Sequence, residues 1–324
     1  MTLLEVDSLR VRYGRGAGSL VAVDGVSLMV EKGASLGVVG ESGSGKSTLA
    51  RAIVQLVPSL SGRIGFDGRD ITNAAGADLR YVRENLQMVF QDQFSTLNPR
   101  RTIGASLAEA IGMHRRRGGG AAGPTVAELL DRVTLGGALA DRYPHELSGG
   151  QLQRVGIARA LAAKPRMLIL DEVTSALDVS VQAAVLNLLR QLRDELDLTY
   201  LCISHDLGVV SYLCEQVMVV YLGQAVERGP RRELLGAPRH PYTAALLASV
   251  PRVHGEPLKV GTAAGDLADP RHPPSGCRFH PRCPVGPSCR EGRARCAGDD
   301  PQPLLAIGGE WAAACHFPLG EERD

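Results

Sequence analysis

The sequence predicts an α/β protein with a mostly parallel sheet, followed by a smaller cysteine-rich extension. Strand patterns alternate with helical patterns through the first two thirds of the chain, as in parallel sheets whose strands are joined by helices. A glycine-rich turn joins one of these strands directly to a helix. After about Pro230, proline, glycine and cysteine become frequent, so we expect a domain at 1–230 and an extension at 231–324.

The spacing of apolar residues predicts the elements of the first half. Residues 3–13 and 20–30 alternate apolar and polar side chains, as half-buried strands do. The apolar run 34–40 predicts a buried strand, and 47–57 has helical spacing. Residues 76–142 are expected to be mostly helical, apart from a low-complexity loop whose residues are 115–124.

The second half continues the alternation of helix and strand. The predicted elements are a helix from Ser148 to just before Pro165, a strand at 167–172, a helix at 181–196, and strands at 198–204 and 216–223. No internal repeat is found.

Composition limits the classes of function. With 36 basic and 35 acidic residues among 324, the net charge of +1 gives no support for nucleic acid as the main partner. The N-terminus lacks the pattern of a secretory signal, and no apolar run approaches the ~18–20 residues that span a bilayer. We therefore expect a cytoplasmic protein that reaches a membrane only through partners.

A phosphate-binding loop is predicted at residues 40–48, GESGSGKST. Glycines in such a loop let backbone N–H groups cradle phosphate oxygens, and the following helix adds its positive N-terminal end. Lys46 would reach the β- and γ-phosphates, and the Ser47 hydroxyl would ligate Mg²⁺. The predicted nucleotide contacts are Gly40, Ser42, Gly43, Ser44, Gly45, Lys46, Ser47 and Thr48.

Two carboxylates close the buried strand at 167–172. Asp171 can hold Mg²⁺ and Glu172 can polarise an attacking water, although a core strand with a polar end is common by itself. The pairing with the loop at 40–48 makes the functional reading the stronger one.

The run 147–151, LSGGQ, places Ser148 as the N-cap of a glycine-rich helix end suited to a γ-phosphate. This run resembles the signature of ATP-binding-cassette ATPases. The resemblance implies a P-loop nucleotide-binding cassette with a RecA-like core, an antiparallel β subdomain and a helical subdomain at about 92–160. It also implies ATP and Mg²⁺, and a second cassette subunit whose nucleotide would be closed over by Ser148, Gly149, Gly150 and Gln151.

Further positions are assigned by the same resemblance. Tyr13 is similar to the aromatic residue that stacks on adenine, and Gln91 to the glutamine that contacts Mg²⁺ and the attacking water. Asp178 resembles the aspartate that bridges two cassettes, and His205 the histidine at the γ-phosphate. From the residues alone, each has a structural alternative: a packed strand aromatic, an isolated glutamine, a helix N-cap and a structural histidine.

The resemblance extends to one branch of the family. The runs 87–100, 175–189, 240–251 and 277–284 resemble the oligopeptide/dipeptide and nickel importers, most closely their second ATPase subunit. The implied partners are a second ATPase, giving a heterodimer, two transmembrane permeases and, indirectly, an extracytoplasmic solute-binding protein. The implied location is the cytoplasmic face of the membrane. Where this branch is expected to carry proline, the sequence has Gln93 and Val173.

Other functions fit the sequence less well. A DNA-repair cassette would need a long coiled coil between residues 46 and 148, and a translation-factor cassette protein would normally carry two cassettes. A P-loop kinase would have no use for LSGGQ. An exporter ATPase is disfavoured because the cysteine-rich extension resembles importers.

Cysteines crowd the last fifty residues, which in a reducing compartment suggests a metal site. Their spacing matches neither a zinc ribbon nor a simple ferredoxin. Two alternatives stay open: reduced thiols without a metal, and a zinc site completed by His280 and His316. By resemblance to peptide-importer ATPases, the sequence predicts a [4Fe–4S] cluster on Cys277, Cys283, Cys289 and Cys315, with Cys296 as a spare.

Overall fold

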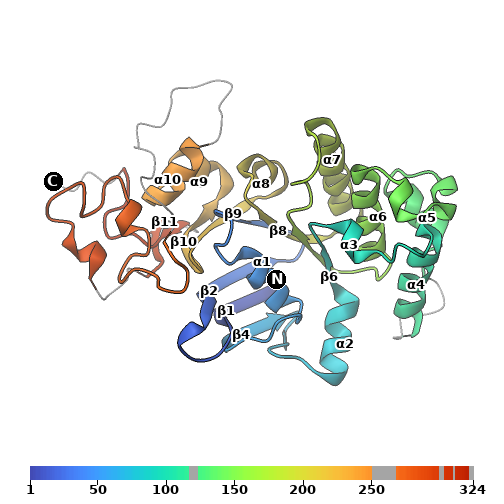
Figure 1. Cartoon of the computed structure of the whole chain (residues 1–324), viewed down its shortest axis with the longest axis horizontal. Helices are drawn as coiled ribbons and strands as arrows, with labels where there is room; N and C mark the ends of the chain where they lie inside the picture. The colour runs from blue at the N-terminus through green and yellow to red at the C-terminus, as the bar shows by residue number, and fades with distance from the viewer. Residues whose placement is uncertain (117–122, 250–267, 299–302, 309–310, 321–324) are drawn as a thin grey trace.

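The computed structural model describes residues 1–116, 123–249, 268–298, 303–308 and 311–320. Two sheets form its centre, one of four antiparallel strands and one of eight strands in mixed orientation (Figure 1). Most of the low-complexity loop predicted at 115–124 lies outside the described residues. Among the helices described, none is long and apolar enough to cross a membrane.

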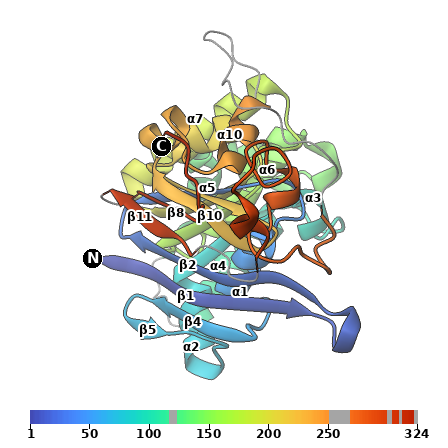
Figure 2. The same ribbon diagram turned by 90° about the vertical axis from the view of Figure 1, so that its left-hand side faces the viewer.

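The antiparallel sheet confirms the two alternating strands predicted at the N-terminus. Its order is β2-β1-β4-β5, and it forms a separate layer beside the main sheet (Figure 2). The strands are β1 (Thr2–Tyr13), β2 (Leu20–Glu31), β4 (Ser61–Phe66) and β5 (Arg69–Asp70). Alternate residues of β1, such as Leu4 and Val6, are buried, which explains the period of two in the sequence.

The main sheet has the order β11-β12-β10-β9-β3-β8-β7-β6. Its parallel strands are β3 (Ser35–Val39), β6 (Leu86–Val89), β7 (Met167–Asp171), β8 (Thr199–Ser204) and β9 (Gln216–Tyr221). The antiparallel strands are β10 (Gln224–Pro230), β11 (Leu305–Gly308) and β12 (Trp311–Ala313). Strand β6 lies within the segment expected to be mostly helical. It has only four residues and directly follows α2 (Gly76–Asn85), so the alternation of apolar and polar residues is too short to predict a strand there.

Helices cover the main sheet and extend it into a side lobe. They are α1 (Lys46–Ile53), α2 (Gly76–Asn85), α3 (Gln93–Thr96), α4 (Ile103–Arg116), α5 (Val126–Arg132), α6 (Gly149–Leu161), α7 (Val179–Leu196), α8 (Leu207–Leu213), α9 (Arg231–Gly236) and α10 (Pro241–Ala248). Helices α3 to α6 gather in one lobe, which we call the helical lobe, at the right of Figure 1.

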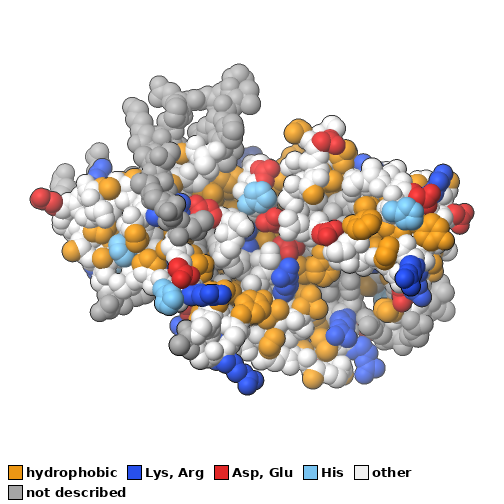
Figure 3. Space-filling view, in the orientation of Figure 1, with side chains coloured by type: hydrophobic (Ala, Val, Ile, Leu, Met, Phe, Trp, Pro, Cys, Tyr) orange, Lys and Arg blue, Asp and Glu red, His pale blue; other side chains and the backbone are white. Residues whose placement is uncertain are grey.

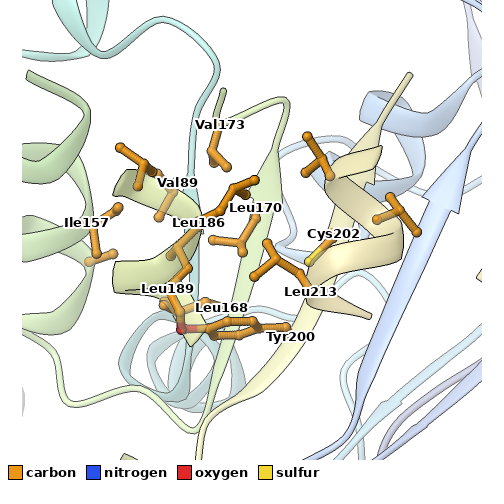
Figure 4. Close-up of a cluster of buried hydrophobic side chains, with 14 of the residues drawn as sticks. Val89, Ile157, Leu168, Leu170, Val173, Leu186, Leu189, Tyr200, Cys202 and Leu213 are labelled. Atoms are coloured by element: carbon orange, nitrogen blue, oxygen red, sulfur yellow. The ribbon is translucent and has the colours of Figure 1, made fainter. Parts of the chain in front are cut away.

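The two faces of the main sheet pack into two separate hydrophobic clusters. Along β7, Leu168 and Leu170 face one cluster while Met167 and Ile169 face the other. The first cluster joins the sheet to α6, α7 and α8, and Figure 4 shows Tyr200 lying across it. The Tyr200 hydroxyl donates a 2.8 Å hydrogen bond to the Leu189 carbonyl, so its one polar atom is satisfied inside the core.

The C-terminal segment comes after the predicted cassette in the sequence, and it also adds strands to the main sheet. Strand β12 pairs with β10, which ends at Pro230, and Trp311 donates a 2.9 Å hydrogen bond to the buried Glu227 carboxylate. Phe279 is 1% exposed and packs against Tyr221 and Tyr242, with ring centroids 5.3 Å apart in each case. This aromatic contact gives the extension a hydrophobic anchor that it could not build alone.

Candidate nucleotide site

The glycine-rich loop lies at the carboxyl end of β3 and leads into α1, as the sequence predicts. Gly45, the residue before α1, has φ +100°, and a Cβ there would lie 2.1 Å from the Ala22 carbonyl oxygen. Any other residue would be strained and would clash at this point. The close approach of β2 to the loop therefore explains why the helix is preceded by glycine.

Lys46 is folded back into the loop. Its Nζ donates hydrogen bonds of 2.8 Å to the carbonyl oxygens of Gly40 and Glu41, and one of 3.3 Å to Ser44 Oγ. Burial lowers the pKa of Lys46, while the negative charges of Glu172, Asp171 and Glu41 act in the opposite direction. These carbonyl oxygens hold the cation at the centre of the loop, where phosphate oxygens would replace them.

Ser47 and Asp171 are in direct contact. Ser47 Oγ donates a 2.8 Å hydrogen bond to Asp171 Oδ1, although the two residues are 124 positions apart. Asp171 is 3% exposed, and burial raises the pKa of its carboxyl group, with the Ser47 hydrogen bond opposing this. A hydroxyl and a carboxylate oxygen at one point form the hard oxygen donor set that Mg²⁺ prefers, so these residues fit the predicted metal.

Glu172 turns the chain sharply at the end of β7. It has φ +48°, unusual for a residue with a side chain, and its N–H donates a 2.9 Å hydrogen bond to the Ile203 carbonyl of β8. His205 Nδ1 lies 3.3 Å from Glu172 Oε1. A strained backbone held in place by a neighbouring strand is typical of functional sites.

Gln91 and Tyr13 lie at the margin of this group. Gln91 Nε2 donates a 3.3 Å hydrogen bond to Ser175 Oγ, four residues after Asp171, so it reaches toward the end of β7. The Tyr13 hydroxyl donates to Thr48 Oγ1 at 3.5 Å, and the residue is 38% exposed. An exposed aromatic ring next to the phosphate loop is available for stacking.

The signature run begins helix α6 in the helical lobe. Ser148 Oγ accepts from Gln151 N at 3.3 Å, and Gln151 Oε1 accepts from Ser148 N at 2.9 Å, which is a complete capping box. Within the described residues, no hydrogen bond or ion pair connects 148–151 to the phosphate loop of the same chain. Figure 1 places α6 in the lobe, away from α1.

Asp178 caps helix α7. Its carboxylate accepts from Ser180 Oγ at 2.6 Å and from Val181 N at 3.0 Å, and these hydrogen bonds lower the pKa of Asp178. The structural alternative considered for this residue is therefore present. Both hydrogen bonds are accepted by Oδ1, and the residue is exposed at the start of α7.

The two positions without the expected proline are both buried. Val173 is 4% exposed and joins the hydrophobic cluster beside Leu170 (Figure 4). The Gln93 side chain donates to the Phe90 carbonyl at 2.7 Å and lies against α6, where a Cβ on Gly156 would be 2.2 Å from Gln93 Cδ. Gln93 thus connects the segment after Gln91 to the signature helix.

The predicted iron–sulfur cluster is not supported. Among the described residues, which include all seven cysteines, no three His, Cys, Asp or Glu side chains form a group that could hold a metal ion. Cys289 is exposed, whereas Cys296, expected to be a spare, is buried. Burial raises the pKa of Cys283 to about 11 and of Cys315 to about 12. The donor set fits neither the cluster nor the zinc alternative.

One contact to the phosphate loop was missed in the sequence. Glu41, inside the loop, is bound through its side chain by Arg282 and through its backbone N–H by Tyr242. Both partners lie in the C-terminal third of the chain. No motif connects residues so far apart, so only the tertiary structure reveals this contact.

Family comparisons match both parts of the chain. A family model described as ABC transporter matches residues 23–175, and one described as Oligopeptide/dipeptide transporter, C-terminal region, matches 226–289. The chain is 48% identical over 302 residues to the oligopeptide transport ATP-binding protein AppF of Bacillus subtilis, covering 90% of this chain and 92% of that protein. It is 45% identical over 305 residues to the oligopeptide transport ATP-binding protein OppF of Salmonella typhimurium, covering 90% and 91%.

Solved structures agree with the fold. The ATP-binding cassette MJ0796, in a dimeric post-hydrolysis state bound to ADP and phosphate, superposes with a TM-score of 0.63 and 29% identity over 71% of this chain and 99% of that one. The ADP conformation of MJ1267, an ATP-binding cassette of an ABC transporter, gives a TM-score of 0.64 and 27% identity, covering 77% and 100%.

Proposed function

This chain belongs to the ABC transporter ATPases of the oligopeptide/dipeptide importer family, and we propose that it hydrolyses Mg·ATP at the site formed by the loop 40–48 and the ends of β7 and β8. It is an ATPase that energises peptide import. The observation that supports the proposed site most strongly is one chain of contacts. Lys46 and Ser47 lie in the loop, Ser47 reaches Asp171, and Glu172 reaches His205.

The proposed roles follow from these positions. Lys46 binds the phosphates, and three side chains face Mg²⁺: Ser47, Asp171 and Gln91. The phosphates are surrounded by the other residues of the loop, which are Gly40, Ser42, Gly43, Ser44, Gly45 and Thr48. The metal, when bound, supplies positive charge that offsets the charge developing on the phosphate oxygens. Glu172 orients and polarises the attacking water, His205 lies at the γ-phosphate, and Tyr13 stacks on adenine.

The division of the chain is also proposed. Residues 1–230 form the cassette, with the helical subdomain at about 92–160, and 231–324 form the extension. The eight-stranded sheet crosses this division, because β12 pairs with β10, so the extension acts as a fixed part of the ATPase. The family match to 226–289 supports a distinct C-terminal region.

A second cassette ATPase is proposed as the partner that completes the site. Within the described part of the chain, no hydrogen bond or ion pair joins residues 148–151 to this chain's own loop. These residues present a helix N-terminus, which suits a phosphate held by another chain. Asp178 would lie at the same contact. The relatives AppF and OppF carry the letter F in their names, which supports the role of the second ATPase subunit for this chain. The proposed assembly is therefore a heterodimer of two different ATPases.

Two transmembrane permeases are proposed to bind the helical lobe at the cytoplasmic face of the membrane, with a solute-binding protein acting on their far side. Phe94 is 50% exposed and Met113 41%, and hydrophobic side chains show on this lobe in the space-filling view (Figure 3). Phe94 follows Gln91 closely, so a permease that moves this segment would move Gln91 as well.

The test is reconstitution of the chain with its partner ATPase, both permeases and the binding protein in vesicles. ATP hydrolysis should rise when a peptide-loaded binding protein is added, and peptide should accumulate inside. Hydrolysis that ignores the peptide-loaded binding protein would contradict the importer function.

A further inference from the structure

The C-terminal extension reaches the phosphate loop through an ion pair. Arg282 Nη1 donates to Glu41 Oε2 at 3.0 Å and Arg282 Nη2 donates to Glu41 Oε1 at 3.2 Å. The two side chains are 12% and 26% exposed. Two parallel hydrogen bonds between a guanidinium and a carboxylate fix the geometry as well as neutralising charge.

The backbone of Glu41 takes part in the loop itself. Its carbonyl accepts a 2.8 Å hydrogen bond from Lys46 Nζ, and its N–H donates to the Tyr242 hydroxyl at 2.9 Å. Glu41 is therefore held at its side chain by the extension, at its N–H by α10, and at its carbonyl by the phosphate-binding lysine.

Arg282 is itself well positioned. It ends the short 3₁₀ helix His280–Arg282, which directly follows the buried Phe279. Nη1 also donates to the Tyr221 hydroxyl at 3.3 Å. Because Tyr221 and Tyr242 both pack against Phe279, one aromatic cluster supports the arginine and the tyrosine that contact Glu41.

A carboxylate inside a phosphate-binding loop opposes binding of a polyphosphate unless its charge is offset. Glu41 is one residue after Gly40, its carbonyl oxygen lies 2.8 Å from Lys46 Nζ, and its negative charge acts to raise the pKa of that lysine. At such distances in a partly buried site, one uncompensated charge changes an affinity by about tenfold. Arg282 is in contact with this carboxylate and supplies the opposite charge.

We propose that Arg282 is a positioning residue for ATP binding: its ion pair neutralises Glu41 and fixes the phosphate loop, making the C-terminal extension part of the nucleotide site. The inference rests on the proposed function of the loop. It assigns the extension a direct effect on nucleotide affinity, separate from catalysis at Glu172.

The test measures binding of a fluorescent ATP analogue to the full chain. Arg282→Gln should weaken binding by about tenfold, because it leaves Glu41 charged beside the phosphates. Arg282→Lys keeps the charge but loses the two-pronged contact, and should lie between wild type and Arg282→Gln. In the reconstituted transporter, KM for ATP should rise while kcat changes by less than about twofold, since Arg282 does not touch the reacting atoms.

The decisive comparison is in a Glu41→Gln background. Without the carboxylate there is no charge to offset, so Arg282→Gln should then change affinity by less than about twofold. An equal loss in both backgrounds would overturn the proposal, because it would mean that Arg282 acts only by packing in the extension. The proposal would also be overturned if Arg282→Gln bound the ATP analogue as tightly as wild type does.

Arg293→Gln is the matched control. Arg293 lies in the same extension, with its guanidinium 4.4 Å from the centre of the Phe317 ring. Among the described residues, no hydrogen bond or ion pair joins Arg293 to Glu41. It should bind ATP as wild type does. If wild type itself failed to bind nucleotide, the proposed function would fail rather than the role of Arg282. If Arg282→Gln did not fold, the effect of Arg282→Lys on ATP affinity would be measured instead, both in the wild-type chain and in the Glu41→Gln background.

Discussion

The Ser47 hydroxyl donates a 2.8 Å hydrogen bond to the Asp171 carboxylate, joining the phosphate loop to the end of β7. The contact brings a predicted Mg²⁺ ligand from each of two distant motifs to one point. Parallel pairing of β3 with β8 and of β8 with β7 aligns the carboxyl ends of these strands, so the loop after β3 and Asp171 meet at one edge of the sheet.

Ser47→Ala should raise the Mg²⁺ concentration needed for half-maximal hydrolysis by about tenfold, because one oxygen ligand is lost while Asp171 is kept. The measurement is ATPase rate against free Mg²⁺ in the assembled transporter. Ser59→Ala, outside the site, should leave the curve unchanged. A Mg²⁺ requirement that stays the same in Ser47→Ala would contradict the assignment of this hydroxyl.

Glu172→Gln and Lys46→Ala should separate catalysis from binding. Glu172→Gln keeps the size of the side chain but removes its negative charge, so nucleotide affinity should stay near wild type while turnover falls at least about 100-fold. Lys46→Ala removes the cation from the loop and should weaken affinity itself. Equilibrium nucleotide binding and steady-state hydrolysis distinguish the two, and normal turnover in Glu172→Gln would exclude it as the catalytic carboxylate.

Ser148→Arg should act on the partner's nucleotide. Among the described residues, no hydrogen bond or ion pair joins Ser148 to its own phosphate loop. The isolated variant should therefore bind nucleotide as wild type does, while hydrolysis by the proposed heterodimer falls sharply. Thr125→Arg is the control: Thr125 caps α5 in the same lobe with an equivalent capping box. Full hydrolysis by a strictly monomeric wild-type chain would refute the shared site.

The sequence was most informative where chemistry and period coincide. The alternation in β1 and β2, the loop before α1 and the two carboxylates at the end of β7 were all predicted. Strand β6 was missed because its four residues, three of them apolar, are too few to show a period. The contact of Arg282 with Glu41 joins residues 241 positions apart, and the cysteine pattern gave no warning that Cys289 would be exposed, since burial depends on the whole fold.

His240 should make the fold sensitive to acid. It is 1% exposed and its Nδ1 accepts from Tyr242 N at 3.0 Å, and burial lowers its pKa from 6.5 to about 3. The unfolded chain therefore binds a proton that the folded chain does not, so stability should fall as pH drops below about 6.5, by up to about 1.4 kcal/mol per pH unit.

This effect is tested by measuring the free energy of unfolding in denaturant at several pH values between the ordinary pKa of carboxyl groups and that of histidine. Burial raises the pKa of the neighbouring Glu227 above the ordinary carboxyl range, so its protonation acts with the opposite sign within this same pH window. His240→Asn keeps an acceptor for the helix cap but does not titrate, and it should flatten the slope. An unchanged slope in this variant would assign the acid sensitivity to another group.

Gly156→Ala should destabilise the protein, although alanine normally favours a helix. The new methyl group would lie 2.2 Å from Gln93 Cδ, and Gln93 is 4% exposed and hydrogen-bonded to Phe90 and Thr96. Moving that amide leaves buried polar groups unpaired, so the free energy of unfolding should drop by about 1–3 kcal/mol. Gly136→Ala, where nothing lies within 4 Å of the new Cβ, should change it little.

The sign of the effect should reverse when Gln93 is shortened. In a Gln93→Ala background the clash is gone, so Gly156→Ala should gain the usual ~0.5–1 kcal/mol of helix preference. Urea unfolding of the four variants in this cycle gives the coupling energy directly. Because Gln93 follows Gln91 and Gly156 lies in the signature helix, a strong coupling would mean that the glutamine segment and the signature move together. Additive effects would show that the two segments are mechanically independent.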